Sequence, residues 1–486
     1  MLRWCRTLSQ SGPGQAVSSW GTISDFLTPL GVHNLQHASK CSLTTGLKSS
    51  SNGILTDLTS PASWYVAARK QRRRIVLHLG PANSGKTFQA LEVLKQAKKG
   101  VYCGPLRLLA AEVADKVNAA GIACSLLTGQ EQRKVAGANH LACTVEMAST
   151  TKPVDVAVID EVQMLADKHR GHAFTRALLG VPAREVHVCG DPAALPLLEK
   201  ILQETGEEVE LREYSRLSAL KVSRRSLGGL HKVRRGDCVV AFSRKQVHLL
   251  RRQIEAQGGR GCCVVYGALP PESRRQQAAL FNTPRTGFNI LAASDAVGMG
   301  LNLNIGRIVF ATMDKFDGVE TRPLTVSETK QIAGRAGRYG SKFSKGIVTT
   351  LDPEDLPILR HAVASPTPEL EAACLFPRFE QLATFAGQHP HMRFSDVLQA
   401  FAEQASLRPH YFFGSAETMH QLAMMLDHLP LSLPDRYTFV TAPADPADPT
   451  VASAFLSFAS RFCHRRSVPI ALVSIPQIDA SLEAFK

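Results

Sequence analysis

The sequence is poor in the features that mark membrane and secreted proteins. No apolar run comes near the ~18 residues that a membrane-spanning helix requires, so the composition predicts no insertion into a membrane. Its 11 cysteines include no C-x-x-C pair, and most of them stand in apolar runs, where a small buried thiol is the usual state. We therefore expect a reducing compartment, with neither a zinc site nor a disulfide framework.

Acidic residues are also scarce. The chain has 42 Asp and Glu against 56 Lys and Arg, which gives a formal net charge of +14. An excess of positive charge this large predicts a polyanion as partner, either a nucleic acid or an anionic membrane surface.

The amino-terminal stretch, residues 1–60, is rich in serine and has almost no acidic residues. Near its start, Arg3 and Arg6 are interleaved with apolar residues. This composition is typical of an organelle transit peptide, and it favours the mitochondrion over the plastid. A disordered tail without a targeting role is the alternative.

One glycine-rich loop follows a short apolar run, Ile75–Leu79, that has the length and branching of a buried strand. The loop fits G-x-x-x-x-G-K-[ST], and a helix is predicted directly after it. Its free backbone N–H groups would cradle the phosphates of a nucleotide, with Lys86 at the β- and γ-phosphates and the Thr87 hydroxyl as a ligand of Mg²⁺. A glycine turn with a coincidental lysine is the alternative. The cofactor-binding residues predicted here are Gly80, Pro81, Ala82, Asn83, Ser84, Gly85, Lys86 and Thr87.

A second apolar run, Val154–Ile159, leads directly into two carboxylates. Asp160 would hold Mg²⁺, and Glu161 would orient and deprotonate the attacking water. A strand that ends in Asp-Glu is common, but here it stands about 75 residues after the phosphate loop in the same α/β unit. Together the two motifs predict that the nucleotide is hydrolysed.

Strand and helix patterns alternate through two successive regions, which predicts parallel sheets with ligands at the carboxyl ends of the strands. Only the first region has a phosphate loop, so we expect the nucleotide in a cleft between the two. The remainder reads as mostly helical, at Leu370–Leu375, Phe379–Phe385, Phe394–Ala405 and Ala416–Leu426. The predicted division is 1–60, 61–216, 217–366 and 367–486.

The second region contains a stretch suited to the far side of such a cleft. Arg335 and Arg338 are three residues apart on a predicted helix, so they would share one face and meet the γ-phosphate as arginine fingers. Gln331 would contact the γ-phosphate or the water. Gly298 and Gly300 follow a predicted strand and would allow close backbone approach to nucleotide or polymer. An exposed basic helix cap is the alternative for the arginines.

Two further residues follow predicted strands of the first region on the same edge. Arg107 comes after the second strand and Thr144 after the fourth. A guanidinium and a hydroxyl placed there could bind the phosphates of a polymer. Each residue taken alone is more often part of a helix cap or a turn.

The motifs GPANSGKT, DEVQ, SDAVGMGLN and QIAGRAGR, in this order, resemble those of superfamily-two helicases. The longer stretches VYCGPLRLLAAEV, VAVIDEVQM, GMGLNLNI and QIAGRAGRYG resemble the suppressor-of-var family, from about residue 64 to 439. The resemblance implies an α/β fold with two tandem RecA-like parallel-sheet domains and a helical carboxyl-terminal region. It also assigns RNA-facing positions to Ser243 and Arg244, as well as to Arg107 and Thr144.

The resemblance further implies an ATP-dependent RNA helicase, a hydrolase that uses ATP and Mg²⁺, with Mn²⁺ as a substitute. Such an enzyme unwinds RNA duplexes with a 3′ single strand in the 3′-to-5′ direction and tolerates DNA. Its setting would be RNA degradation and surveillance in the mitochondrial matrix, with plastid and nucleus less favoured. Its partner would be a 3′-exoribonuclease such as polynucleotide phosphorylase.

The chain departs from the family pattern at both ends. The long helical region that animal members carry before the ATPase core is missing, and the sequence stops at Lys486, where members continue. We therefore expect a truncated carboxyl-terminal region, which either guides the RNA strand or only buttresses the second domain. The short carboxyl end leaves a non-unwinding RNA-binding ATPase scaffold of an exoribonuclease complex as one alternative function. An organellar DNA helicase or translocase is another, because the core motifs do not specify the sugar of the polymer.

Overall fold

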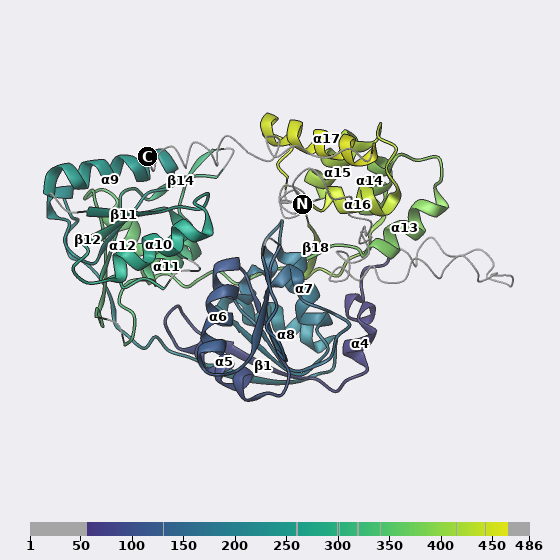
Figure 1. Ribbon diagram of the computed structural model, residues 1–486, viewed down its shortest axis with the longest axis horizontal. Helices are drawn as coiled ribbons and strands as arrows, with labels where there is room; N and C mark the ends of the chain where they lie inside the picture. Colours follow the sequence, from purple (N-terminus) through teal and green to yellow (C-terminus); the bar gives the residue numbers. More distant parts are fainter. Residues whose placement is uncertain are drawn as a thin grey trace, which may run out of the picture.

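The structure is a computed structural model that describes residues 56–464, except 130, 259–260, 299, 301, 318–319, 341, 415 and 443. Most of the predicted transit peptide therefore lies outside the described residues. The described chain forms two sheet domains and a mostly helical carboxyl-terminal region (Figure 1). In that view the first sheet domain lies below, the second at the left and the helical region at the upper right.

The first sheet has eight strands in the order β4-β3-β5-β2-β6-β7-β1-β8, all parallel except for β4, which runs antiparallel to β3. Its strands are β1 (Arg74–Leu79), β2 (Gly100–Gly104), β3 (Cys124–Leu127), β4 (Gln132–Arg133), β5 (His140–Thr144), β6 (Val154–Ile159), β7 (Ala183–Gly190) and β8 (Glu208–Glu213). Five of the six residues of β1 are buried, as the apolar run predicts.

Helices cover both faces of the first sheet. One apolar cluster joins α5 and α6 to the sheet, and another joins α7 and α8 to its other face. The main helices are α5 (Lys86–Gln96), α6 (Arg107–Ala119), α7 (Gly171–Gly180) and α8 (Leu195–Gln203). The short ones are η3 (Pro61–Trp64), α4 (Val66–Arg69), η4 (Val145–Met147), η5 (Val162–Ala166) and η6 (Pro192–Ala194).

The second sheet has six parallel strands in the order β11-β12-β10-β13-β16-β9. Its strands are β9 (Leu220–Val222), β10 (Asp237–Val240), β11 (Gly261–Val265), β12 (Phe288–Ala293), β13 (Arg307–Phe310) and β16 (Gly346–Thr350). Helix α9 packs on one face, and α10, α11 and α12 pack on the other. The helices are η7 (Leu230–Lys232), α9 (Arg244–Gly258), α10 (Pro271–Asn282), η8 (Asp295–Gly298), α11 (Val326–Ala333) and α12 (Leu356–Ala364), and a hairpin joins β14 (Asp314–Phe316) to β15 (Thr321–Pro323).

The α/β prediction, with two parallel-sheet domains and a helical region after them, is confirmed. Sequence patterns missed β8 and β9, which lie at sheet edges. Strand β8 has four exposed residues, Glu208, Val209, Leu211 and Glu213, and none that is buried, so it lacks the buried apolar run by which the other strands are found. The first sheet ends at Glu213 and the second begins at Leu220, so the predicted division after residue 216 falls between them.

The carboxyl-terminal region contains α13 (Phe379–Gln388), α14 (Phe394–Gln404), α15 (Ala416–Leu426), α16 (Leu433–Val440) and α17 (Pro449–Cys463). The prediction of a helix at Leu370–Leu375 is wrong. Ala373–Leu375 forms strand β17, which pairs in parallel with β18 (Tyr411–Phe413). All three residues of β17 are buried, and a buried apolar segment of this length does not distinguish helix from strand by periodicity.

This region packs on the first sheet domain. The Thr175 hydroxyl of α7 donates to the carbonyl of Cys374 at 2.7 Å, and Arg408 pairs with Glu204 just after α8 at 2.9 Å. The alternative prediction, that this region only buttresses the second domain, would place such contacts on the second sheet domain. These contacts lie on the first. Among the described helices, none combines the length and apolarity needed to cross a bilayer.

Candidate active site

The phosphate loop connects β1 to α5, and its backbone conformation leaves the helix start open. Gly85, the residue before α5, has φ +83°, a left-handed conformation that favours glycine, and no side chain caps the helix. The first N–H groups of α5 are therefore left for a ligand. Ser84 is buried, and its hydroxyl has no hydrogen-bond partner. A buried polar atom of this kind fits a site that receives phosphate oxygens.

Lys86 lies in the first turn of α5 and is 9% exposed. Its ammonium group donates to the carbonyl of Pro81 at 3.1 Å, so it curls back over the loop. A buried lysine held by one neutral carbonyl can exchange that contact for phosphate oxygens, which carry charge.

Asp160 follows β6 and is 4% exposed. It accepts hydrogen bonds from Thr87 Oγ1 at 3.0 Å and from the Tyr102 hydroxyl at 2.9 Å. Burial and the neighbouring charge of Glu161 raise the pKa of Asp160 to about 6. Two carboxylates and a hydroxyl, all oxygen donors, thus lie together at the end of the loop. This donor set fits Mg²⁺, and Thr87 with Asp160 would hold it.

Glu161 adopts a left-handed backbone conformation, with φ +59°. A residue with a side chain pays about 1–2 kcal/mol for this conformation, and such strain is concentrated at functional sites. Gln163 Nε2 donates to Glu161 Oε2 at 2.5 Å, and Gln163 Oε1 accepts from the Asp191 backbone N–H at 3.1 Å. Gln163, the last residue of DEVQ, thus fixes the Glu161 carboxylate; sequence reasoning gave it no role.

The second sheet domain contacts the phosphate loop directly. Asn83 Nδ2 donates to the carbonyl of Gly337 at 2.8 Å and to Ser218 Oγ at 2.7 Å. Arg216, in the segment between the two sheets, donates to the carbonyl of Ala82 at 2.9 Å. Its guanidinium also donates to two carbonyls of the turn after α11, those of Gly334 at 3.0 Å and Ala336 at 2.5 Å. The loop and the arginine-bearing turn therefore face each other across one cleft.

The prediction that Arg335 and Arg338 share a helical face is wrong, because α11 ends at Ala333 and both arginines lie in the turn beyond it. Arg335 Nε donates to the carbonyl of Gly298 at 2.7 Å. Burial lowers the pKa of Arg335, while the negative charges of Glu161 and Asp160 across the cleft act in the opposite direction. Arg338 has an exposed side chain that donates to Asn302.

Family models cover most of this architecture. A model described as the DEXQ-box helicase domain of Suv3 matches residues 61–214, and the helicase conserved C-terminal domain matches residues 221–340. The mitochondrial DExH-box ATP-dependent RNA helicase DExH16 of Arabidopsis thaliana is 51% identical, over 86% of this chain and 73% of that protein. The mitochondrial ATP-dependent RNA helicase SUV3 of Oryza sativa subsp. japonica is 47% identical, over 95% of this chain and 80% of that protein.

The chain belongs to the Suv3 helicase family. The resemblance to the suppressor-of-var family is thereby confirmed. The model of Suv3 C-terminal domain 1 matches residues 421–463, which run from α15 through α17, whereas the resemblance found in the sequence ended at about residue 439. A solved structure of the Escherichia coli DEAH/RHA helicase HrpB has a TM-score of 0.51 at 15% identity, covering 86% of this chain and 58% of that one. This likeness shows the fold alone.

The two glycines that were predicted to approach nucleotide or polymer, Gly298 and Gly300, have different neighbours in this Suv3-family chain. A side-chain carbon built on Gly298 would lie 3.6 Å from Gln331, so the Gly298 loop and α11 are in contact. Gly300 has φ +82°, and a built carbon would come within 2.8 Å of Leu106 in the first domain. The close approach predicted for Gly300 is therefore to the other domain.

The four predicted RNA-facing residues differ in accessibility. Arg107 is exposed at the start of α6. Thr144 is 5% exposed at the end of β5, so little of its surface is accessible. Ser243 is exposed and accepts from the Gln246 backbone N–H at 3.1 Å, which makes it the cap of α9. Arg244 lies over the Tyr266 ring, 5.9 Å from its centre. Their contacts with RNA remain predictions.

Proposed function

We propose that this Suv3-family protein is an ATP-dependent RNA helicase that acts in mitochondria on duplexes with a 3′ single strand. One observation carries the proposal: the turn that holds Arg335 is hydrogen-bonded to the phosphate loop through Asn83 and Arg216. A triphosphate on this loop would have the water-activating carboxylates on one side and a guanidinium on the other. Such a cleft couples hydrolysis to relative movement of the two domains.

The first domain supplies binding and activation of water. The backbone N–H groups at the end of the loop and at the open start of α5, with the Lys86 ammonium, bind the β- and γ-phosphates. Thr87 and Asp160 would hold Mg²⁺, or Mn²⁺ in its place, and the bound ion would neutralise phosphate charge. Glu161, fixed by Gln163, orients the attacking water and takes its proton.

The second domain supplies charge to the transition state. Arg335 is partly buried opposite Glu161 and stabilises the negative charge that develops on the γ-phosphate oxygens. Gln331 contacts the γ-phosphate or the water, and Arg338 acts as a second finger when it leaves Asn302. Hydrolysis breaks the bond between the γ-phosphate and the nucleotide, and release of the free phosphate then removes the charge that joins the domains, so the cleft opens.

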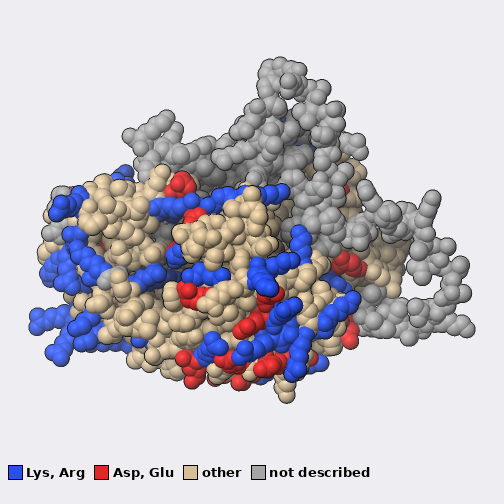
Figure 2. All heavy atoms as spheres, turned by 60° about the horizontal axis from the view of Figure 1, so that its bottom comes forward, with Lys and Arg blue, Asp and Glu red and all other residues tan. Residues whose placement is uncertain are grey.

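A basic surface supports RNA as the polymer. Figure 2 shows Lys and Arg side chains gathered at the left of the view, where the second sheet domain lies. Helix α9 contributes Arg244, Lys245, Arg251 and Arg252 against one acidic residue, Glu255. Contacts between such side chains and phosphates carry no base code, so RNA binding should tolerate any sequence and weaken with salt.

The finer proposals are 3′-to-5′ polarity, a place in the mitochondrial matrix, and a 3′-exoribonuclease partner such as polynucleotide phosphorylase. They rest on the family alone.

The test is strand displacement by the full chain on RNA duplexes with a 3′ tail, a 5′ tail or no tail, with ATP present. We expect displacement of the 3′-tailed RNA and little of the others. Hydrolysis without displacement would favour the scaffold, and stronger stimulation by DNA of matched length would favour a DNA helicase or translocase. Either result would overturn the proposal.

A further inference from the structure

The hairpin β14–β15 lies between the loop that ends at Gly298 and helix α11, and the proposed mechanism gives it no task. Its two strands pair antiparallel, with Lys315 opposite Arg322. Both cations are partly buried, since their side chains are 24% and 32% exposed. Ion pairs that are shielded from water in this way are worth more than fully exposed pairs.

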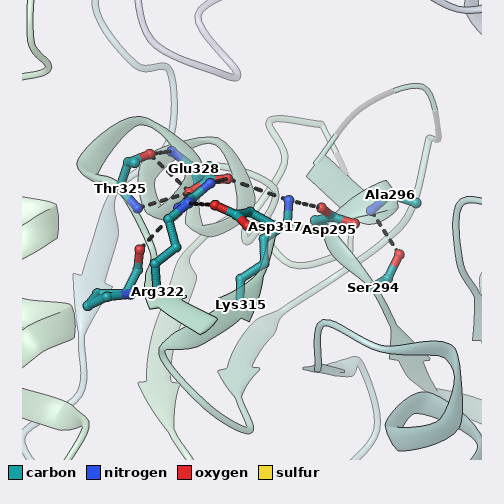
Figure 3. Close-up of polar contacts among 9 residues, drawn as sticks. Ser294, Asp295, Ala296, Lys315, Asp317, Arg322, Thr325 and Glu328 are labelled. Carbon is teal, nitrogen blue, oxygen red and sulfur yellow. Dashed lines mark hydrogen bonds and ion pairs between the residues drawn. The ribbon is translucent and has the colours of Figure 1, made fainter. Parts of the chain in front are cut away.

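Lys315 connects two elements that the chain separates. Its ammonium group donates to Asp295 Oδ2 at 2.5 Å and lies 3.5 Å from Glu328 Oε1. Asp295 begins η8, which leads to Gly298, and Glu328 lies in the first turn of α11. Figure 3 shows the Lys315 ammonium between the two carboxylates. One side chain of the hairpin therefore fixes the position of η8 relative to α11.

Glu328 is held from a second side as well. Arg322 donates to both of its carboxylate oxygens, at 2.9 and 3.1 Å, and Thr325 forms a reciprocal capping box with it at the start of α11. Burial would raise the pKa of Glu328, but the hydrogen bonds from Arg322 and the Thr325 backbone, with the charge of Lys315, outweigh it and lower that pKa to about 2. Glu328 therefore stays ionised at neutral pH, and its contact with Lys315 persists.

The same two elements hold Arg335. Its guanidinium donates to the carbonyl of Gly298 at the end of η8, and its backbone follows α11 by two residues. A shift of η8 against α11 would therefore move the acceptor away from the donor. A misplacement of about 1 Å in a catalytic group costs roughly 100-fold in rate.

We propose that Lys315 is a positioning residue, which sets Arg335 against the triphosphate by tying η8 to α11 through Asp295 and Glu328. This inference rests on the proposed function, because it gives Arg335 the role of a finger. Lys315 itself lies outside the cleft contacts and acts only through these two elements.

The experiment compares ATP turnover of the full chain carrying Lys315→Met with that of the unmodified chain, at saturating RNA. We expect kcat to fall about 10- to 100-fold, with KM for ATP changed less than about twofold because the loop that binds ATP is intact. Lys315→Arg keeps the charge and should restore most of the rate. Lys221→Met removes an exposed lysine on β9 of the same sheet and serves as the matched control.

A double-mutant cycle with Arg335→Ala decides whether Lys315 acts through Arg335. If it does, Lys315→Met should cause little further loss once Arg335 is gone. Additive losses, or parallel changes in kcat and KM, would overturn the inference while leaving ATP hydrolysis by the unmodified chain in place. An unmodified chain that does not hydrolyse ATP would overturn the proposed function and this inference together.

Asp295→Asn is the second variant, in case Lys315→Met lowers the unfolding temperature. It removes the negative charge of one of the two carboxylates that contact Lys315, keeps an amide oxygen that can accept a hydrogen bond, and leaves the Glu328 cap of α11 intact. A smaller fall in kcat in the same direction is expected, again absent in the Arg335→Ala background. An unchanged kcat would count against the inference.

Discussion

The two sheet domains differ in how a helix begins after an interior strand of the sheet. In the first domain, β1 leads to a loop whose last glycine caps α5 with no side chain, so the N–H groups at the helix start are free for a ligand. In the second domain, β10 leads to Ser243, whose hydroxyl accepts the backbone N–H of Gln246 at the start of α9. One N–H group at the start of α9 thus already has a hydrogen-bond acceptor, so this helix start has fewer free donors for an anion.

The difference explains how one fold, present twice, builds one site. The first domain offers phosphates the open start of α5 with Lys86, whereas the second contributes Arg335 and closes the helix start after β10 with Ser243. Each domain therefore provides what the other lacks, and the site is complete only when both are in contact. The following variants test that division, from the largest expected effect to the smallest.

Lys86→Ala should reduce ATP turnover by at least about 10³-fold. The variant lacks the cation of the phosphate loop, which stabilises phosphate charge both in bound ATP and in the transition state. RNA binding should partly survive. Phosphate release measures the first effect and filter binding the second. Lys95→Ala, at a partly exposed i,i+3 pair on the same helix, is the control and should leave turnover unchanged. Substantial turnover in Lys86→Ala would refute the loop assignment.

Glu161→Gln should retain binding of ATP with Mg²⁺ but lose about 10²- to 10⁴-fold in turnover, the range of a general base. Glutamine can still accept the hydrogen bond from Gln163, so the local backbone should be kept. Equilibrium binding of a fluorescent ATP analogue, beside steady-state rates, separates the two effects. Normal turnover would remove Glu161 from its role.

Arg335→Ala should lower kcat by about 10²- to 10³-fold with ATP affinity nearly unchanged, because its guanidinium acts on charge that develops in the transition state. Arg338→Ala should cost less, since its exposed side chain contacts Asn302 in the second domain. The ratio of the two kcat values is the readout. A larger loss for Arg338 would reverse the assignment of the main finger.

Ser243→Ala should lower the free energy of unfolding by about 1 kcal/mol, as the loss of a helix cap does. Ser243→Gly should lower it by only a few tenths of a kcal/mol. Thermal unfolding of the full chain without nucleotide measures both. If neither variant changes the unfolding temperature, the second helix start is not held by its own cap, and the contrast between the domains fails at this point.

The sheets also differ in buried histidine. His78 and His187 are buried in the first sheet and lie 2.8 Å apart, Nε2 to Nδ1, whereas no strand of the second sheet contains histidine. Burial lowers the pKa of His78 to about 4. Between that value and about 6.5 the unfolded chain binds more protons, so stability is complete above this window and falls as pH falls through it.

Acid should therefore destabilise the first domain before the second. Unfolding temperatures measured between pH 7 and pH 4.5 should show this fall, and His78→Gln should make it shallower. An equally steep fall in that variant would exclude His78 as its source.

Local motifs made the loop and the carboxylates predictable, because their function depends on spacing within one strand–loop–helix unit. Arg216 and Ser218 could not be predicted, because their roles arise only from how the two domains meet. The arginine turn was misread as helix because Gly334 and Gly337, which favour a helix end, were read as helix residues. Helices α16 and α17 were missed because Pro434 and Pro449 were read as punctuation, whereas both lie in first helical turns.

Arg216 has a consequence for the resting state. Its one guanidinium satisfies acceptors on both walls of the cleft, and separation of the domains would leave at least one wall's carbonyls to be rehydrated. Charge-assisted hydrogen bonds of this kind favour the closed conformation of the two domains even when no ATP is bound. Opening of the cleft must break these hydrogen bonds. We therefore expect release of products, and not capture of ATP, to limit the rate of the cycle.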